Sequence, residues 1–476
     1  MLAPATATAQ ATDEVWILPA FYVPNSATGV FPCRFFQEKE DRTGTVMDEL
    51  QAIHKWPTTH QRLTHFSFLQ NLMVDDAFCE GVDSSYTFFN NDTTDAAAEL
   101  TAWTNGDRDG DGTVESHPLE VGVISQAFFL DSPAIPTTDP NYQTQLDASD
   151  LCKYDVAPGY FGKEEAAKAF PLYKRWLAND GRIDYVQMDF PLWRAYEDIR
   201  PAFNAGFDCP KTGGMRQSLY EVWPIPRLAD ELAAFLDDMQ QRVNDAVGTD
   251  PGDLTAAQAA NYDPDVLLWT AVGLELTDPD SGADPIANGE SLEYVLECVR
   301  LYIEGGTGSV CEPGTTVTGV QGSPKFEGVS IDADPSYVER QGFMAGLGVD
   351  TWLFDRLITM QEVVRGLGLE VSVSNHMGPC GQGKENPGGV LRDACYNESA
   401  MTATNFNHWA RETFLRYADE FVTAGGRPDH LMLNQWLYYP ATWGTEFDDP
   451  TAPGFSALSE ITKEVLTDTY PRLVPI

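Results

Sequence analysis

Hydrophobic and polar residues alternate along the chain in a pattern of short strands, each followed by a longer amphipathic segment. Eight segments rich in β-branched and aromatic residues lie between turn signals, as expected for strands. These predicted strands span 15–24, 63–74, 120–130, 182–190, 265–276, 326–333, 369–378 and 429–440. Predicted helices, with apolar residues at helical spacing, follow them at 45–56, 93–104, 163–180, 227–247, 291–303, 351–368, 406–426 and 454–470.

Eight strand-helix units in this order predict an α/β fold, a (β/α)8 TIM barrel, because a doubly wound sheet usually has five or six strands. The second and fifth units are the weakest assignments, and the length and periodicity of 265–276 also suit a helix. We expect a single domain over 13–476, with long loops at the carboxyl ends of the strands, where active-site loops belong. Insertions are predicted at about 76–119, 131–162, 191–226, 277–324 and 378–404.

The net charge of the chain limits the classes of molecule that it is expected to bind. With 30 Lys and Arg against 72 Asp and Glu, the net charge is −42 over 476 residues. Binding to nucleic acid draws most of its affinity from Lys and Arg, so DNA, RNA and anionic membranes are excluded as expected partners. The sequence contains no run of 18 apolar residues, so it predicts no membrane-spanning helix. So large an acidic excess suits a salty environment, where ions screen the self-repulsion.

The cysteines indicate an exported protein. There are eight, an even number, and none has CxxC spacing, which favours disulfides over a zinc ribbon. Cys298 with Cys311, and Cys380 with Cys395, would close the shortest loops. The alternative is a set of buried free thiols. Residues 1–12 are expected to be disordered or the remnant of a signal peptide, since Ala9-Gln10-Ala11 has the A-x-A form that precedes cleavage.

Residues 107–114, DRDGDGTV, carry aspartates at alternate positions followed by Gly112. The segment resembles the first eight positions of an EF-hand loop, in which alternate carboxylates converge on calcium and the glycine permits the turn. Pro118 stands where that loop has its last glutamate, so another carboxylate has to complete the shell. The predicted ligands of a structural calcium are Asp107, Asp109, Asp111, Thr113, Glu115 and Glu120. The alternative is a solvated acidic turn.

Candidate catalytic residues stand at the ends of different predicted strands, as barrel enzymes require. They are Asp189 on the fourth strand, Glu275 after the fifth, and Asp332 and Asp334 on the sixth. Amide, imidazole and aromatic groups stand nearby as candidate substrate contacts: Trp193, Asn375, His376, Asn434, Gln435, Trp436, Tyr438 and Tyr439. Paired carboxylates cleave glycosidic bonds and aromatic faces stack on sugar rings, so this set predicts a carbohydrate substrate.

Two short motifs resemble glycoside hydrolase barrels. FEGVSIDADP is similar to the DGxDxDxE signature of the chitinase-like family, with Asp332 matching and with Glu327, Ser330 and Asp334 where Asp, Asp and Glu belong. The α-galactosidase-like clan has a nucleophilic aspartate at the end of strand four and an acid at the end of strand six. IDYVQMDF and SIDADP resemble that arrangement. It implies Asp189 as nucleophile or base, and Asp332 or Asp334 as acid.

Other readings of the site stay open: a polysaccharide lyase or other carbohydrate-active enzyme, and a carbohydrate-binding barrel without catalysis. The sequence contains no GxSxG, HExxH, GxGxxG or GxxxxGK[ST] motif. His54, His60 and His65 have no common metal-ligand spacing. Substrate, linkage and oligomeric state do not follow from the sequence.

Overall fold

The structure is a computed structural model, and it describes part of the chain. The described residues are 14–18, 63–69, 96–107, 110–114, 117–126, 158–189, 225–271, 292–332, 349–376, 423 and 425–434. These segments contain all eight strands predicted from the sequence.

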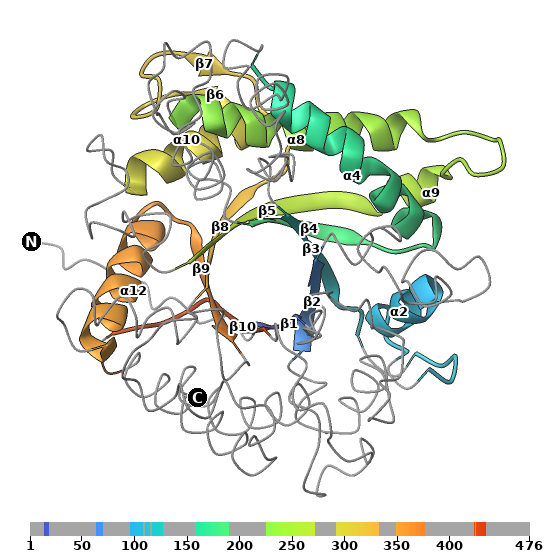
Figure 1. Cartoon of the computed structure of the whole chain (residues 1–476), viewed down its shortest axis with the longest axis horizontal. Helices are drawn as coiled ribbons and strands as arrows, with labels where there is room; N and C mark the ends of the chain where they lie inside the picture. Colours follow the sequence, from blue (N-terminus) through green and yellow to red (C-terminus); the bar gives the residue numbers. More distant parts are fainter. Residues whose placement is uncertain are drawn as a thin grey trace, which may run out of the picture.

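Eight parallel strands form a closed barrel in the order β1-β10-β9-β8-β5-β4-β3-β2. Figure 1 looks along this barrel, and the strands form a ring around its centre. The strands are β1 Glu14–Leu18, β2 Leu63–Leu69, β3 Glu120–Gln126, β4 Ile183–Asp189, β5 Tyr262–Ala271, β8 Phe326–Asp332, β9 Glu370–His376 and β10 His430–Asn434. The predicted (β/α)8 fold is confirmed, and the ambiguous fifth unit is a strand.

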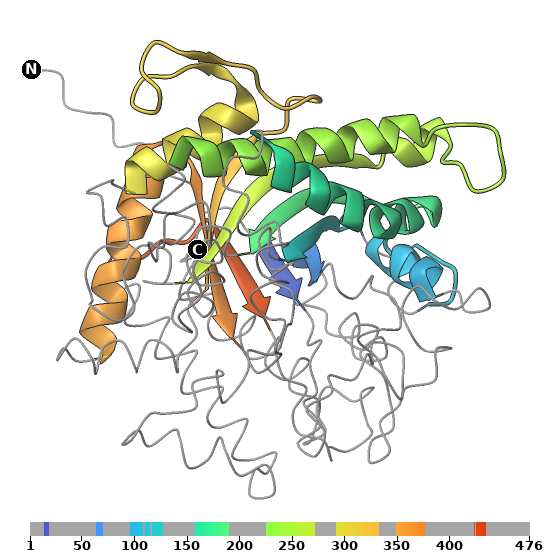
Figure 2. The same ribbon diagram turned by 45° about the horizontal axis from the view of Figure 1, so that its top comes forward.

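The helices cover the outer face of the barrel (Figures 1 and 2). They are α2 Ala96–Thr104, α4 Tyr160–Ala178, α8 Ile225–Asp245, the short α9 Ala256–Ala259, α10 Leu292–Glu304 and α12 Val349–Gly366. The helices predicted at 45–56 and 454–470, and nearly all of that at 406–426, lie outside the described residues. In the part of the chain that the structure describes, no helix is long and apolar enough to cross a membrane.

A small hairpin interrupts the regular alternation after α10. Strands β6 Gly306–Thr307 and β7 Thr316–Val317 pair antiparallel, and the predicted disulfide between Cys298 and Cys311 ties this segment to the helix. The hairpin connects a helix to the start of the next strand, so it lies at the amino ends of the strands, opposite the arrowheads in Figure 2. Of the insertion predicted at 277–324, the described residues 292–324 contain α10 and this hairpin.

The core lies between strands and helices because alternate strand residues face outward. On β2, Phe66 contacts Trp103 of α2 and Phe68 contacts Trp176 of α4, with ring centroids 5.4 and 5.3 Å apart. All four side chains are buried. The residue between the two phenylalanines, Ser67, is therefore on the inner face of the barrel.

At the amino ends of the strands, carboxylates of one element accept backbone N–H groups of a neighbour. Asp184 of β4 accepts from Val121 of β3 at 2.8 Å, and Asp265 of β5 accepts from Lys325 at 2.8 Å. Without such partners these N–H groups would be left unsatisfied at the barrel edge. Part of the acidic content therefore closes this end of the barrel.

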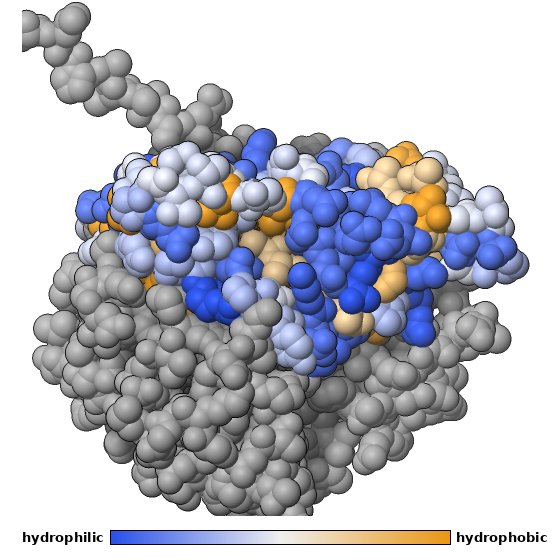
Figure 3. All heavy atoms as spheres, turned by 90° about the horizontal axis from the view of Figure 1, so that it is seen from above, coloured by the Kyte–Doolittle hydropathy of each residue, from blue (hydrophilic) through white to orange (hydrophobic). Residues whose placement is uncertain are grey.

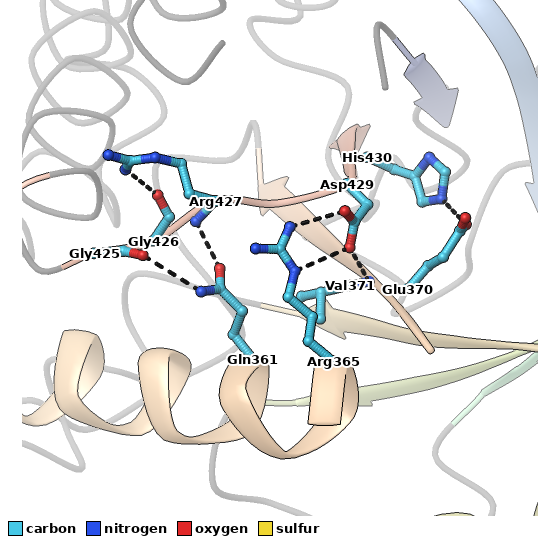
Figure 4. A network of polar contacts seen from close by, with 9 residues as sticks. All are labelled: Gln361, Arg365, Glu370, Val371, Gly425, Gly426, Arg427, Asp429 and His430. Atoms are coloured by element: carbon cyan, nitrogen blue, oxygen red, sulfur yellow. Dashed lines mark hydrogen bonds and ion pairs between the residues drawn. The ribbon is translucent and has the colours of Figure 1, made fainter. Parts of the chain in front are cut away.

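A carboxylate that accepts a backbone N–H group also joins β9, β10 and α12. Asp429 accepts the N–H of Val371 at 2.9 Å and pairs with Arg365 of α12 at 2.8 Å. Gln361, one turn earlier on the helix, accepts the N–H of Arg427 at 2.6 Å. Figure 4 shows these contacts between the helix and the segment that enters β10. They hold the last barrel strand in register with its neighbour.

Candidate active site

The carboxyl-end rim of the barrel carries several of the candidate residues. Asp189 is the last residue of β4, Asp332 the last of β8, His376 the last of β9 and Asn434 the last of β10. Asn375 precedes His376, and His376 is in register with Asn434. Residues from four different strands therefore end at one rim, as the sequence predicts for a barrel active site.

The two aspartates are separated by a single strand, β5. Asp189 is in register with Trp269, and Trp269 is in register with Ser330. Asp332 therefore stands two residues further along its strand than the level of Asp189. The rest of the predicted set, namely Asp334, Glu275, Trp193, Gln435, Trp436, Tyr438 and Tyr439, lies outside the described residues.

Beneath this rim, the inside of the barrel is lined partly by polar side chains. Ser67, Gln187, Ser330 and Ser372 are all fully buried. Their side-chain oxygen and nitrogen atoms have no hydrogen-bond partner in the protein. Gln187 and Ser330 stand two residues before Asp189 and Asp332 on their strands. We call these four residues the lumen set.

The opposite, amino-terminal end of the barrel holds a cluster that the sequence analysis missed. His65 of β2 pairs with Glu120 of β3 at 3.2 Å, and His430 of β10 pairs with Glu370 of β9 (Figure 4). The two imidazole rings lie 6.2 Å apart. The fifth member is Glu327 of β8, and we call these five residues the N-terminal cluster.

Within the N-terminal cluster, the pKa values of Glu120 and Glu327 shift in opposite directions. The hydrogen bond from the His65 ring, aided by its charge, holds the pKa of Glu120 below its ordinary value. Burial raises the pKa of Glu327 to about 7, and the negative charges of Asp265 and Glu370 add to the rise. The members of the N-terminal cluster come from strands that are far apart in sequence. The sequence alone did not reveal the cluster because it does not give the order of the strands in the barrel. In barrels of this type, residues at this end support stability more often than chemistry.

The predicted calcium loop is described in part. The buried carboxylate of Asp107 accepts the N–H groups of Gly110 and Gly112, both at 2.9 Å, and Asp111 accepts that of Thr113 at 2.8 Å. Asp109 and Glu115 lie outside the described residues. Glu120, as described above, is paired with His65. No group of three or more His, Cys, Asp or Glu residues among the described part of the chain is arranged to hold a metal.

Comparisons with known proteins assign no family. No family model matches the sequence, and no curated protein matches it significantly. Among solved structures, the catalytic domain of a beta-amylase from Paenibacillus polymyxa is similar, with a TM-score of 0.40 and 10% identity over 97% of this chain and 100% of that one.

Two further solved structures show similarity at the same level. A structure of fungal beta-1,4-galactanases has a TM-score of 0.35 and 11% identity over 87% of this chain and 90% of that one. A broad-specificity endoglucanase from an uncultured bacterium has a TM-score of 0.32 and 11% identity over 96% and 94%. Such identities are too low to give this chain the activity of any of these proteins.

Proposed function

We propose that the protein is a glycoside hydrolase that cleaves a poly- or oligosaccharide with two carboxyl groups. The observation that supports this most directly is the position of Asp189 and Asp332 at the ends of β4 and β8, with β5 between them. Two strand spacings of about 4.8 Å, combined with an offset of two residues along the strand, place these two backbone positions roughly 12 Å apart. Glycosidases use carboxyl groups about 5 to 10 Å apart, a separation that side chains converging from these two positions would reach.

In this proposal the two carboxyl groups divide the work. Asp332 or Asp334 is the general acid that protonates the leaving glycosidic oxygen. Asp189 either attacks the anomeric carbon or takes a proton from the attacking water, and Glu275 is the remaining candidate for that role. Asn375, His376, Asn434 and Gln435 would bind sugar hydroxyls, while Trp193, Trp436, Tyr438 and Tyr439 would stack against sugar rings.

The test is turnover of a glycan panel by Asp189→Asn, Asp332→Asn and Asp334→Asn variants. Loss of an acid or base typically costs on the order of 10²- to 10⁴-fold in rate, so we expect at least two of the three to fall by that much. Asp250→Asn, in an exposed turn beyond α8, is the matched control and should keep full turnover. If all three variants fold normally and remain fully active, the assignment is wrong.

The products separate this proposal from its alternatives. A hydrolase incorporates one water-derived oxygen into each new reducing end, which cleavage in ¹⁸O-water detects by mass. A polysaccharide lyase eliminates instead and leaves an unsaturated sugar without label. A binding barrel retains the glycan unchanged, and calorimetry would then detect binding without turnover.

We also propose that the protein is exported and holds a structural calcium at 107–114. The disulfide between Cys298 and Cys311 supports an oxidising compartment. The backbone contacts of Asp107 support a preformed turn, and each carboxylate oxygen keeps a lone pair for a cation. Glu120 is left out of the ligand set because it is paired with His65. A melting temperature that chelation leaves unchanged and that added calcium does not raise would refute the calcium site.

A further inference from the structure

Three carboxyl groups from neighbouring strands come together at the amino end of the barrel, below the lumen set. Glu327 of β8 is hydrogen-bonded to Asp265 of β5, and Glu370 of β9 is near enough to act on it through its charge. Glu370 is the register partner of Gly328, and a Cβ on Gly328 would lie only 2.0 Å from the Glu370 carbonyl oxygen. The close approach of β8 and β9 therefore holds the three acidic groups together.

The hydrogen bond between Glu327 and Asp265 requires a proton, because two ionised carboxylates can only accept. The Asp265 carboxylate already accepts the N–H of Lys325 at 2.8 Å, so it is the acceptor in this pair as well. The proton belongs to Glu327. Burial raises the pKa of Glu327 to about 7, and the charges of Asp265 and Glu370 add to the rise.

The other charged groups around Glu327 offer little compensation for a negative charge there. His430 of β10 opposes the rise in the pKa of Glu327, but its ring is paired with Glu370 (Figure 4). Glu304 of α10 is a further carboxylate and accepts the N–H of the residue before Glu327 at 3.0 Å. Arg365 of α12 is paired at 2.8 Å with the carboxylate that precedes β10. The remaining titratable members of the N-terminal cluster are His65 and Glu120.

The backbone pairing of β5 with β8 is irregular where the carboxyl pair lies. Val266 and Leu267 are consecutive on β5, but their partners are Phe326 and Gly328. Glu327 is therefore an extra residue of the kind that forms a β-bulge, and such a residue locally disrupts the ladder of hydrogen bonds. At this point a side-chain contact supplements the weakened backbone contact between the two strands.

We propose that the carboxyl pair of Glu327 and Asp265 is a pH-dependent switch, which fastens the start of β8 to β5 when Glu327 is protonated and releases it when Glu327 is ionised. Loss of the proton to solvent breaks the hydrogen bond and leaves like charges close together. Local opening at the bulge lets water solvate these charges. The switch concerns the fold, and it does not depend on the reaction proposed above.

Hydrogen exchange read by mass spectrometry at pH 6 and pH 8, corrected for the intrinsic effect of pH on exchange, tests the switch. We expect the amides of 323–330 and 262–268 to lose protection by up to about tenfold at the higher pH, because the opened segment returns Glu327 to its ordinary pKa. Residues 236–242, inside α8, are the internal reference and should keep their protection. Equal loss at all three segments, or no loss at the first two, overturns the proposal.

Two variants and a control attribute the effect to the carboxyl pair. Glu327→Gln donates to Asp265 at every pH and should keep its protection at pH 8. Asp265→Asn can still accept the N–H of Lys325 and donates to an ionised Glu327, so it should also reduce the loss, and it decides the matter if the first variant does not fold. Glu362→Gln, on the exposed face of α12, should behave as wild type. A wild-type loss of protection in either folded variant of the pair refutes the switch.

Discussion

At the scale of single residues, Glu327 at the start of β8 couples stability to pH. Burial raises its pKa to about 7 from an ordinary value of 4.5, Asp265 and Glu370 add to the rise, and His430 opposes it. Between about pH 4.5 and 7 the folded protein keeps a proton that the unfolded chain releases. The stability that Glu327 contributes is therefore highest at the acid end of this window and falls as the pH rises.

We expect Glu327→Gln to flatten this dependence. An amide stays neutral at every pH, so the variant should gain on the order of 1 to 2 kcal/mol over wild type between pH 5 and pH 8, after allowance for partial exposure. Urea unfolding at both pH values measures the difference. Glu293→Gln, on the exposed face of α10, is the control. Identical pH slopes for Glu327→Gln and wild type would contradict the raised pKa.

At the scale of elements, the contact between α4 and α8 depends on one buried carboxylate. Glu231 of α8 is fully buried and accepts the N–H groups of Gly159 and Gly162 at 3.0 and 2.9 Å. These groups open α4, whose N-cap residue Gly159 has no side chain to satisfy them. Arg227 pairs with the same carboxylate at 2.8 Å. A side chain from one helix thus replaces the missing cap of the other.

Removing this carboxylate should be costly. We expect Glu231→Ala to lower the free energy of unfolding by about 3 kcal/mol or more, because it leaves a half-buried arginine and two N–H groups without their acceptor. Glu231→Gln keeps one acceptor oxygen and should cost less. Glu165→Ala, which breaks a more exposed pair with Lys168 on α4, should cost at most about 0.5 kcal/mol. Equal losses for Glu231→Ala and Glu165→Ala would refute the capping role.

The sequence predicts the individual strands but not the contacts between them. The strands were predictable because their apolar runs are local, and so were the carboxylates at their ends. Single polar residues among apolar neighbours, namely Gln187 on β4, Ser330 on β8 and Ser372 on β9, already mark the inner face. The pairs His65–Glu120 and Glu370–His430 join residues about 55 to 60 positions apart. Such contacts depend on strand order and register, which local periodicity does not contain.

At the scale of the whole molecule, the net charge of −42 is spread over a surface with few cations to balance it. Among the coloured residues in Figure 3, hydrophilic ones predominate and hydrophobic ones form small separate patches. Several basic residues of the described segments form close pairs, such as Arg182 with Asp184 at 2.6 Å and Arg365 with Asp429 at 2.8 Å. Most carboxylates therefore have no close cation and repel one another through solvent. Salt screens this repulsion more effectively than it screens the attraction within short, partly buried ion pairs.

We therefore expect the melting temperature to rise with salt, and most of the rise to occur below about 0.5 M sodium chloride. Screening acts over the Debye length, which shortens from about 30 Å at 0.01 M to about 10 Å at 0.1 M and about 3 Å at 1 M. Salt can also stabilise the fold in a second way, because ions that are excluded from the protein surface favour the burial of apolar groups. Sulfate has this effect more strongly than chloride. Thermal unfolding in chloride and sulfate at equal ionic strength separates the two. A melting temperature that is flat at low ionic strength and rises only in concentrated sulfate would show that charge repulsion does not limit the stability of this fold.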